Sequence, residues 1–161
     1  MSADRREAFR LWINELPLSR ELGLLCTEIG PRGARGEVRA RDAQRNPDGN
    51  ISGALIAAAV DIIGGIGVTA ASDGLGSATA DLTVHFLAPA RVDPLSFEVE
   101  VLRQGRRTCV PHIRVHDANG RLCVVATGTW MLRDTPVAID ELRSADHDDR
   151  AETAAAARPA R

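Results

Sequence analysis

Apolar and polar residues follow three different patterns along the chain, and each pattern predicts a different kind of element. Near the N-terminus, four apolar residues recur at helical spacing between charged residues: Phe9, Trp12, Ile13 and Leu16. This spacing predicts an amphipathic helix from Asp4 to Leu16 that ends at Pro17. We expect the helix to pack on the outside of the domain.

The second pattern, short apolar runs between turn residues, predicts β-strands. Residues 24–29 and 37–41 flank the turn-rich segment GPRGARG and predict a first hairpin. Further runs follow with short links and no helix between them: residues 77–89, 95–104, 106–117 and 121–132. Short links predict antiparallel neighbours. Pro111 lies inside one run, and because proline removes a ladder donor we expect a bulge or a local edge there.

The third pattern is an uninterrupted apolar stretch, GALIAAAVDIIGGIGVTAA, from Gly53 to Ala71. Its length approaches the roughly twenty residues of a membrane helix. The central Asp61, the Gly and Ala content and the lack of a basic flank argue against a membrane span. We therefore predict a helix that is buried on every side, with the antiparallel sheet wrapped around it, which is an α+β fold.

Composition and charge narrow the classes of function. The chain has 161 residues, enough for one domain, and its 44% apolar content can build a core. All twenty basic residues are arginine, but the formal net charge is −2 and no element has a basic excess, which argues against a nucleic-acid partner. The charged N-terminus lacks the apolar run of a secretory signal. We expect a cytoplasmic protein.

The cysteines and histidines do not form a convincing metal site. Cys26, Cys109 and Cys123 are an odd number of widely spaced residues, and we expect them to be buried and reduced. His112 and His116 fall on one predicted strand, where four residues span about 13 Å, too far for one ion. We expect no metal and no cofactor.

Asp61 is the first candidate for chemistry. An ionised carboxylate inside an apolar helix is costly unless it is paired, hydrogen-bonded or open to a cavity. The residues one helical turn away from Asp61 are small and leave space beside it: Ala57, Ala58, Gly64 and Gly65. The alternative is a structural Asp that bonds only to backbone or to an Arg across an oligomer interface.

Four segments together resemble the hotdog-fold thioesterases of the PaaI (phenylacetyl-CoA thioesterase) type: NPDGNISGALIAAAVD, SATADLTVHFLAPA, VLRQGRR and DANGRLCVVATGT. The resemblance covers residues from about 22 to 132. In that family an Asn-Pro-x-Gly turn leads into His-Gly-Gly, with an acidic residue nine positions after the His. Here Asn46 opens the turn, Ser52-Gly53-Ala54 replaces His-Gly-Gly, and Asp61 is nine residues after Ser52. Thr79 stands eighteen residues beyond the acid, where the family has Ser or Thr.

The resemblance implies a hotdog fold and hydrolysis of an acyl-CoA thioester to a free acid and CoA. It implies that the Gly53 amide, at a helix N-terminus, donates to the thioester oxygen. Asp61 would be the general base, or the nucleophile that passes through an anhydride. Thr79 and Asn46 would hold the water or the carboxylate. Because the site of relatives lies between subunits, we expect a homodimer or a dimer of dimers.

Other positions are expected to contact the substrate. Ser52 and Ala54 belong to the motif next to the reacting group, and Arg91, Arg106 and Arg107 lie at strand ends where arginine can bind CoA phosphates. Ser52 replaces the motif His and is also a good N-cap. This change is expected either to slow the enzyme or to favour a different acyl group.

Two other classes of function remain open. The first is a non-catalytic acyl-CoA-binding or scaffold protein, which Ser52 in place of His favours and the retained motif residues disfavour. The second is a hydratase, which needs an Asp and His pair; His85 and His112 are the strand candidates, and neither lies in a recognisable hydratase motif. For the whole chain we expect a helical segment at 1–21, the hotdog domain at 22–133 and a mobile tail at 134–161.

Overall fold

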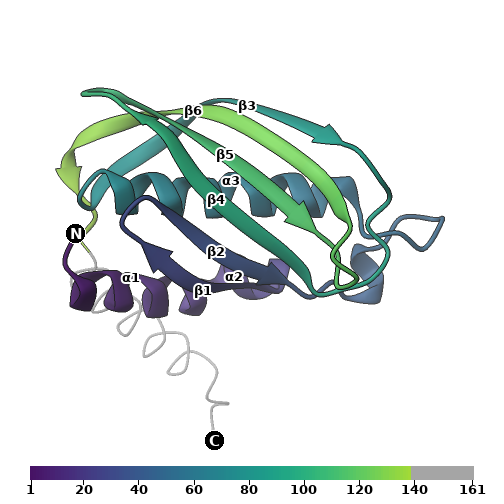
Figure 1. Cartoon of the computed structure of the whole chain (residues 1–161). Helices are drawn as coiled ribbons and strands as arrows, with labels where there is room; N and C mark the ends of the chain where they lie inside the picture. The colour runs from purple at the N-terminus through teal and green to yellow at the C-terminus, as the bar shows by residue number, and fades with distance from the viewer. Residues whose placement is uncertain (139–161) are drawn as a thin grey trace, which may run out of the picture.

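A curved antiparallel sheet packs against a long helix in the computed structural model, which describes residues 1–138 (Figure 1). The helices are α1 (Ala3–Glu15), α2 (Pro17–Leu22), the 3-10 turn η1 (Asp42–Gln44) and α3 (Gly53–Ala71). The strands are β1 (Leu24–Gly30), β2 (Gly33–Val38), β3 (Leu75–Phe86), β4 (Leu95–Gln104), β5 (Thr108–His116) and β6 (Leu122–Pro136). Their order in the six-stranded sheet is β1-β2-β4-β5-β6-β3. This architecture confirms the predicted α+β hotdog fold.

The central helix α3 has the predicted bounds and lies very close to the sheet. A Cβ added at Gly64 would come within 2.9 Å of the Trp130 ring, and one added at Gly67 within 2.7 Å of Val99. Glycine at these two positions therefore lets side chains of β6 and β4 pack directly on the helix backbone. Trp130 and Val99 are themselves buried in the core.

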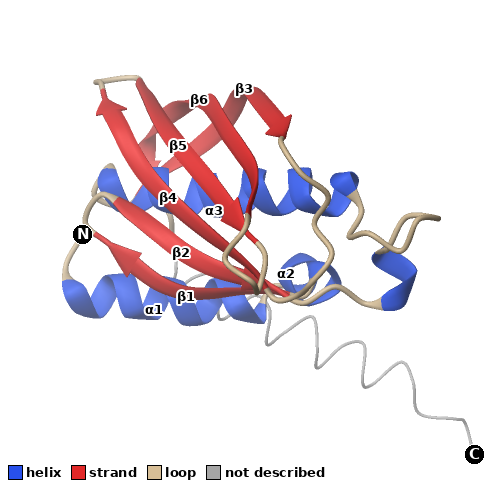
Figure 2. Ribbon diagram, turned by 45° about the vertical axis from the view of Figure 1, so that its right-hand side comes forward, coloured by secondary structure: helices blue, strands red, loops and turns tan. Residues whose placement is uncertain are grey.

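Residues 1–138 leave one face of α3 uncovered, so the expectation that the helix is buried on every side is wrong for this part of the chain. Ala54 is exposed, and the residues that follow it on this face are only half-buried: Ala57, Ala58, Asp61, Ile62 and Gly65. The sheet lies against one side of the helix (Figure 2), and an all-apolar sequence cannot tell which side that is. The helix is long and apolar enough to cross a membrane, yet 61% of its apolar window is buried within the described residues.

The N-terminal helix forms as predicted, but the chain does not leave helical structure at Pro17. Phe9 and Ile13 of the predicted stripe are buried, while Trp12 and Leu16 are half-buried. A second helix, α2, begins at Pro17 itself. Proline is favoured at the first position of a helix because its missing N–H is not needed there. A proline that appears to end one helix can therefore begin the next.

The first hairpin differs from its prediction. Strand β2 begins at Gly33, inside the segment that reads as a turn, and it ends at Val38 rather than at residue 41. A Cβ at Gly36 would lie 2.9 Å from Cδ1 of Ile63 on α3, so this glycine serves close packing and not a turn. The predicted irregularity near Pro111 is confirmed, because the register of β4 shifts between Val101, which pairs with Pro111, and Arg103.

The last strand is longer than the run that predicts it. Strand β6 continues to Pro136, past the expected domain end at residue 133. Its last residues pair with the start of β3, where Leu75 faces Pro136. Most of the expected mobile tail, residues 139–161, lies outside the described residues.

Candidate active site

Asp61 and Thr79 form a preassembled pair on the uncovered face of α3. The Thr79 hydroxyl donates to Oδ1 of Asp61 at 2.6 Å. Asp61 is half-buried in the third turn of the helix, and Thr79 is exposed on the neighbouring edge strand β3. A short hydrogen bond from a hydroxyl fixes one carboxylate oxygen and leaves the other free to accept from water or substrate.

A bulge in β3 turns Thr79 toward the helix. Leu82, Val84 and Phe86 face the buried residues of β6, so even-numbered positions point inward there. The register shifts between Thr79 and Asp81, and Thr79 is then opposite the buried Trp130. The extra residue reverses the alternation, which puts an odd-numbered side chain on the inward face. Simple alternation along this strand would have placed Thr79 outside.

The N-terminus of α3 carries a free amide donor at Gly53. Ser52 is the N-cap, and its side chain accepts from the Ala54 amide at 3.3 Å. The Gly53 N–H finds no acceptor within residues 1–138. The first turn of a helix presents such unpaired N–H groups together with the positive end of the helix dipole, so this amide can bind an oxygen that gains negative charge.

Asn46 organises the loop that leads to this donor. Its side-chain oxygen accepts from the amides of Asp48 and Asn50 at 3.1 and 2.9 Å, and Gly49 takes the left-handed conformation that closes the turn. The oxygen is therefore occupied by the loop itself. Any contact between the Asn46 side chain and a substrate would come from its NH₂ group.

A cavity of about 360 Å³ opens beside the Gly53 amide. Its walls are mainly apolar and include no charged side chain: Asn46, Asn50, Ile51, Gly53, Ile56, Phe86, Leu87, Ala88, Pro89 and Ala90. Ser52 and Ala54 instead line a second cavity of about 350 Å³ at the helix start, with Leu22, Ala43, Gln44, Arg45 and Leu55.

Arg45 holds the site loop in place and was not singled out from the sequence. Its guanidinium pairs with Asp93 at 2.6 Å and also donates to the carbonyl oxygens of Gly49 and Arg91. Both partners of the ion pair are about three-quarters buried, with 24% and 25% of their side chains exposed. The contact ties the Asn46 turn to the loop before β4. All twenty basic residues are arginine, so nothing in the sequence distinguishes Arg45 from the others.

The three arginines expected at CoA lie in two different places. Arg91 is next to the cavity, and its Nε donates to Oδ1 of Asn50 at 3.3 Å. Arg106 and Arg107 are exposed in the turn between β4 and β5. Strand β4 spans about 30 Å between this turn and the Gly53 end. These two arginines therefore lie far from the Gly53 amide of their own chain (Figure 1).

The structure divides the expected catalytic residues into two groups. Asn46 and Gly53 lie together at the cavity, and Asp61 and Thr79 lie together further along α3. Gly53 and Asp61 are eight residues apart in one helix, which corresponds to about 12 Å along its axis. A base and an oxyanion donor that act on one carbonyl group each need to be about 3 Å from the reacting atoms. One chain alone does not bring the two groups that close.

Comparisons with known proteins agree with this fold. Residues 48–124 match the thioesterase superfamily. A candidate esterase of Saccharolobus solfataricus is 35% identical over 101 residues, which cover 63% of this chain and 72% of the relative.

Solved structures show the same architecture. The PaaI protein of E. coli, from the phenylacetic acid degradation operon, superposes with a TM-score of 0.76 at 16% identity, over 84% of this chain and 99% of that one. A hypothetical thioesterase of Streptococcus pneumoniae, solved with coenzyme A, gives 0.64 at 23% identity over 68% and 85%. At such identities these two structures support the fold alone. The sequence match to the S. solfataricus relative, together with the family match, shows that the chain belongs to the thioesterase superfamily.

Proposed function

We propose that the protein hydrolyses acyl-CoA thioesters and that Asp61 activates the attacking water. Membership of the thioesterase superfamily supports thioester hydrolysis in general. The main support for this role of Asp61 is the 2.6 Å hydrogen bond that it accepts from Thr79 on the open face of α3. Asp61 makes no ion pair with another described residue, and a half-buried carboxylate that is aimed by a hydroxyl is suited to accept a proton.

The proposed reaction uses the two groups of residues in turn. Asp61 takes a proton from water as the water oxygen attacks the thioester carbon. The Gly53 amide donates to the oxyanion of the tetrahedral intermediate. When the intermediate collapses, the carbon–sulfur bond breaks, and the proton passes from Asp61 to the CoA sulfur. In the alternative route Asp61 attacks the carbon itself, releases CoA and leaves an anhydride that water hydrolyses.

A second copy of the chain would bring the two groups of residues close together. In the proposed site Gly53 comes from one subunit and Asp61 from the other, which removes the constraint of about 12 Å within one helix. Isologous dimers repeat every contact twice, so such a dimer would have two equivalent sites. A dimer of two such dimers is compatible with the same arrangement.

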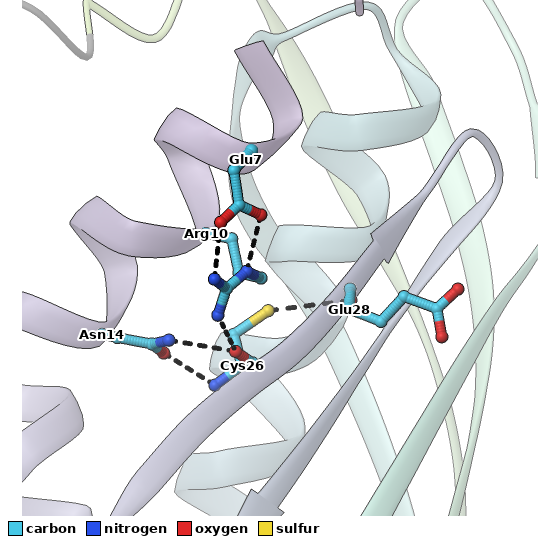
Figure 3. A network of polar contacts seen from close by, with 5 residues as sticks. All are labelled: Glu7, Arg10, Asn14, Cys26 and Glu28. Carbon is cyan, nitrogen blue, oxygen red and sulfur yellow. Dashed lines mark hydrogen bonds and ion pairs between the residues drawn. The ribbon is translucent and has the colours of Figure 1, made fainter. Parts of the chain in front are cut away.

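The two edges of the sheet support β3 as the contact between copies. The β1 edge is closed by α1: the Asn14 side chain accepts from the Cys26 amide at 2.7 Å and donates to its carbonyl at 3.0 Å (Figure 3). The β3 edge has no such cover within residues 1–138, and Ala78 to Asp81 are exposed along it. An open edge strand is a template for another strand, and natural proteins rarely leave a long one bare.

Antiparallel pairing of two β3 strands would also bring Arg106 and Arg107 of one subunit near the Gly53 amide of the other. It reverses the second subunit end for end, so the partner's β4–β5 turn is carried toward the Gly53 end of the first. Arg106 and Arg107 of that turn, together with Arg91 of the first subunit, are the proposed phosphate contacts of CoA. Ser52 and Ala54, which flank Gly53 in the chain and line the second cavity, are the remaining proposed substrate contacts.

The cysteines support the proposed cytoplasmic location. All three are free and buried within the fold. Burial raises the pKa of each thiol, which keeps it protonated and unreactive.

A non-catalytic acyl-CoA-binding protein is the second candidate. Ser52 stands in place of the motif His, and its side-chain oxygen is the N-cap of α3 through the bond it accepts from the Ala54 amide; the loss of the His favours this candidate. A protein that kept the cavity and lost turnover would bind CoA esters without releasing CoA.

Release of free CoA from a panel of acyl-CoAs, measured for wild type and Asp61→Asn, tests the proposal. We expect wild-type turnover on at least one ester and a loss of about 100-fold or more in Asp61→Asn. Equal rates in the two proteins would remove Asp61 from the chemistry. Tight binding without turnover by wild type would favour the binding protein instead.

A further inference from the structure

The Phe86 side chain lies against the proposed oxyanion donor. A Cβ added at Gly53 would come within 3.3 Å of two atoms of the Phe86 ring. Phe86 is the last residue of β3 and belongs to the wall of the cavity beside Gly53. The ring is 54% exposed, so it is not a core residue whose place is fixed by packing on all sides.

Of the two substituents on a thioester carbonyl carbon, only one matches the cavity that Phe86 borders. A carbonyl carbon bound at the Gly53 amide carries two substituents, the acyl group and the sulfur of CoA. The cavity of about 360 Å³ has mainly apolar walls without a charged side chain, and CoA carries phosphates. An apolar acyl group is therefore the substituent that matches the cavity.

We propose that Phe86 determines the size of acyl group that the site accepts. The inference rests on the proposed acyl-CoA hydrolysis and adds to it the residue that selects among acyl groups. The ring occupies volume directly next to the reacting carbon, so acyl groups that extend past it have to displace it. Smaller side chains at this position enlarge the cavity, and larger ones shorten it.

The experiment compares kcat/KM for butyryl-, octanoyl- and dodecanoyl-CoA in three variants. We expect Phe86→Ala to raise the ratio of dodecanoyl to butyryl turnover by about tenfold or more, since one methylene in an apolar pocket changes specificity by about 10- to 200-fold. Phe86→Trp should change the ratio in the opposite direction. Leu25→Ala is the matched control, because Leu25 is 49% exposed on the far edge strand β1 and should leave the ratio unchanged.

Two results would overturn the inference, and they differ from each other. If wild type and variants hydrolyse acyl-CoAs with the same chain-length ratio, Phe86 does not select the acyl group, while the proposed function stands. If wild type hydrolyses neither these three esters nor any other acyl-CoA of the panel, the proposed function fails and the role of Phe86 fails with it. Thermal unfolding followed by far-UV circular dichroism checks that all variants remain folded.

Discussion

At the scale of single residues, the hydrogen bond between Thr79 and Asp61 is the contact on which the proposed chemistry depends. It joins a strand to a helix, and it exists because a bulge turns Thr79 inward. A base that must meet a water at one angle gains from having one oxygen held, because small misplacements of reacting groups cost large factors in rate.

Replacement of Thr79 by valine should therefore lower kcat more than it changes KM. Valine keeps the shape of threonine and loses the donor, and we expect a fall of about 10- to 100-fold in kcat. Thr79→Ser, which keeps the hydroxyl, should stay within a few-fold of wild type by the same argument. Steady-state kinetics on the best acyl-CoA make the comparison. If valine and serine variants behave alike, the hydroxyl does not position Asp61.

Some residues of the candidate site could be predicted from the sequence, and others could not. Asp61 could be found because a charge in an apolar helix is costly, and its spacing to Asn46, Gly53 and Thr79 resembled a family motif. Arg45 could not be found, because its partner Asp93 is 48 residues away and only the folded loops bring the pair together. The bulge beside Thr79 was equally hidden, since one extra residue leaves no mark in an alternating pattern.

At the scale of elements, periodicity predicted most of the fold and packing decided the rest. The apolar run gave the bounds of α3 and the short alternating runs gave β4 with its observed ends. The sequence-based predictions were wrong where a Gly or Pro residue can have either of two structural roles. Glycine in β2 read as a turn although it serves contact with α3, and Pro17 read as a stop although it begins α2. The uncovered face of α3 could not be assigned, because Ala and Gly occur on both of its faces.

Asn14 anchors α1 to the backbone of β1, in addition to the buried side chains of Phe9 and Ile13. The amide of Asn14 makes two hydrogen bonds with the backbone of Cys26, in the way that a neighbouring strand would, and Arg10 adds a longer one from its ion pair with Glu7 (Figure 3). Without Asn14, the Cys26 N–H loses its partner and the Cys26 carbonyl keeps only the longer bond from Arg10. A buried polar group that is left unpaired costs about 1–3 kcal/mol.

Asn14→Ala should therefore lower the free energy of unfolding by about 1–3 kcal/mol. Urea unfolding measures the loss, and amide hydrogen exchange should show faster exchange at Cys26. Glu15→Ala, an exposed change on the same helix, is the control and should be near neutral. An unchanged midpoint in Asn14→Ala would mean that α1 is held by its apolar stripe alone.

At the scale of the whole molecule, Cys26 links stability to alkaline pH. Burial raises the pKa of its thiol from 9.0 to about 12. Between these values the unfolded chain loses the proton and the folded chain keeps it, so the free energy of unfolding falls as pH rises. The full slope for one group is about 1.4 kcal/mol per pH unit. The chain has neither Lys nor Tyr, so few other groups titrate in this range.

We expect wild type to lose stability between about pH 9 and pH 12, and Cys26→Ala to lose less over the same range. Cys109 and Cys123, whose pKa values are also raised by burial, should leave a residual slope. Urea unfolding at a series of pH values provides the curves. If the free energy of unfolding falls equally with pH in the two proteins, Cys26 does not cause the pH dependence.

The whole molecule also explains why the chemistry is assigned to a dimer. One edge of the sheet is closed by α1 and the other, β3, is open next to Asp61 and Thr79 within residues 1–138. This open edge, the open face of α3 and the separation of Gly53 from Asp61 all support the proposed dimer. The central claim is therefore a site that combines Gly53 of one subunit with Asp61 of the other.

Mixed dimers test this claim most directly. Gly53→Pro removes the donor N–H at the first helical position, which proline favours, and the ψ of 133° at Ser52 suits a residue before proline. The new Cβ lies 3.3 Å from the exposed Phe86 ring, which has to shift by a few tenths of an ångström. Asp61→Asn and Gly53→Pro dimers should each be inactive. When the two chains are co-expressed with different tags and purified as mixed dimers, one complete site forms per dimer, and about half of wild-type CoA release should return. Mixed dimers as inactive as either parent would contradict the shared site.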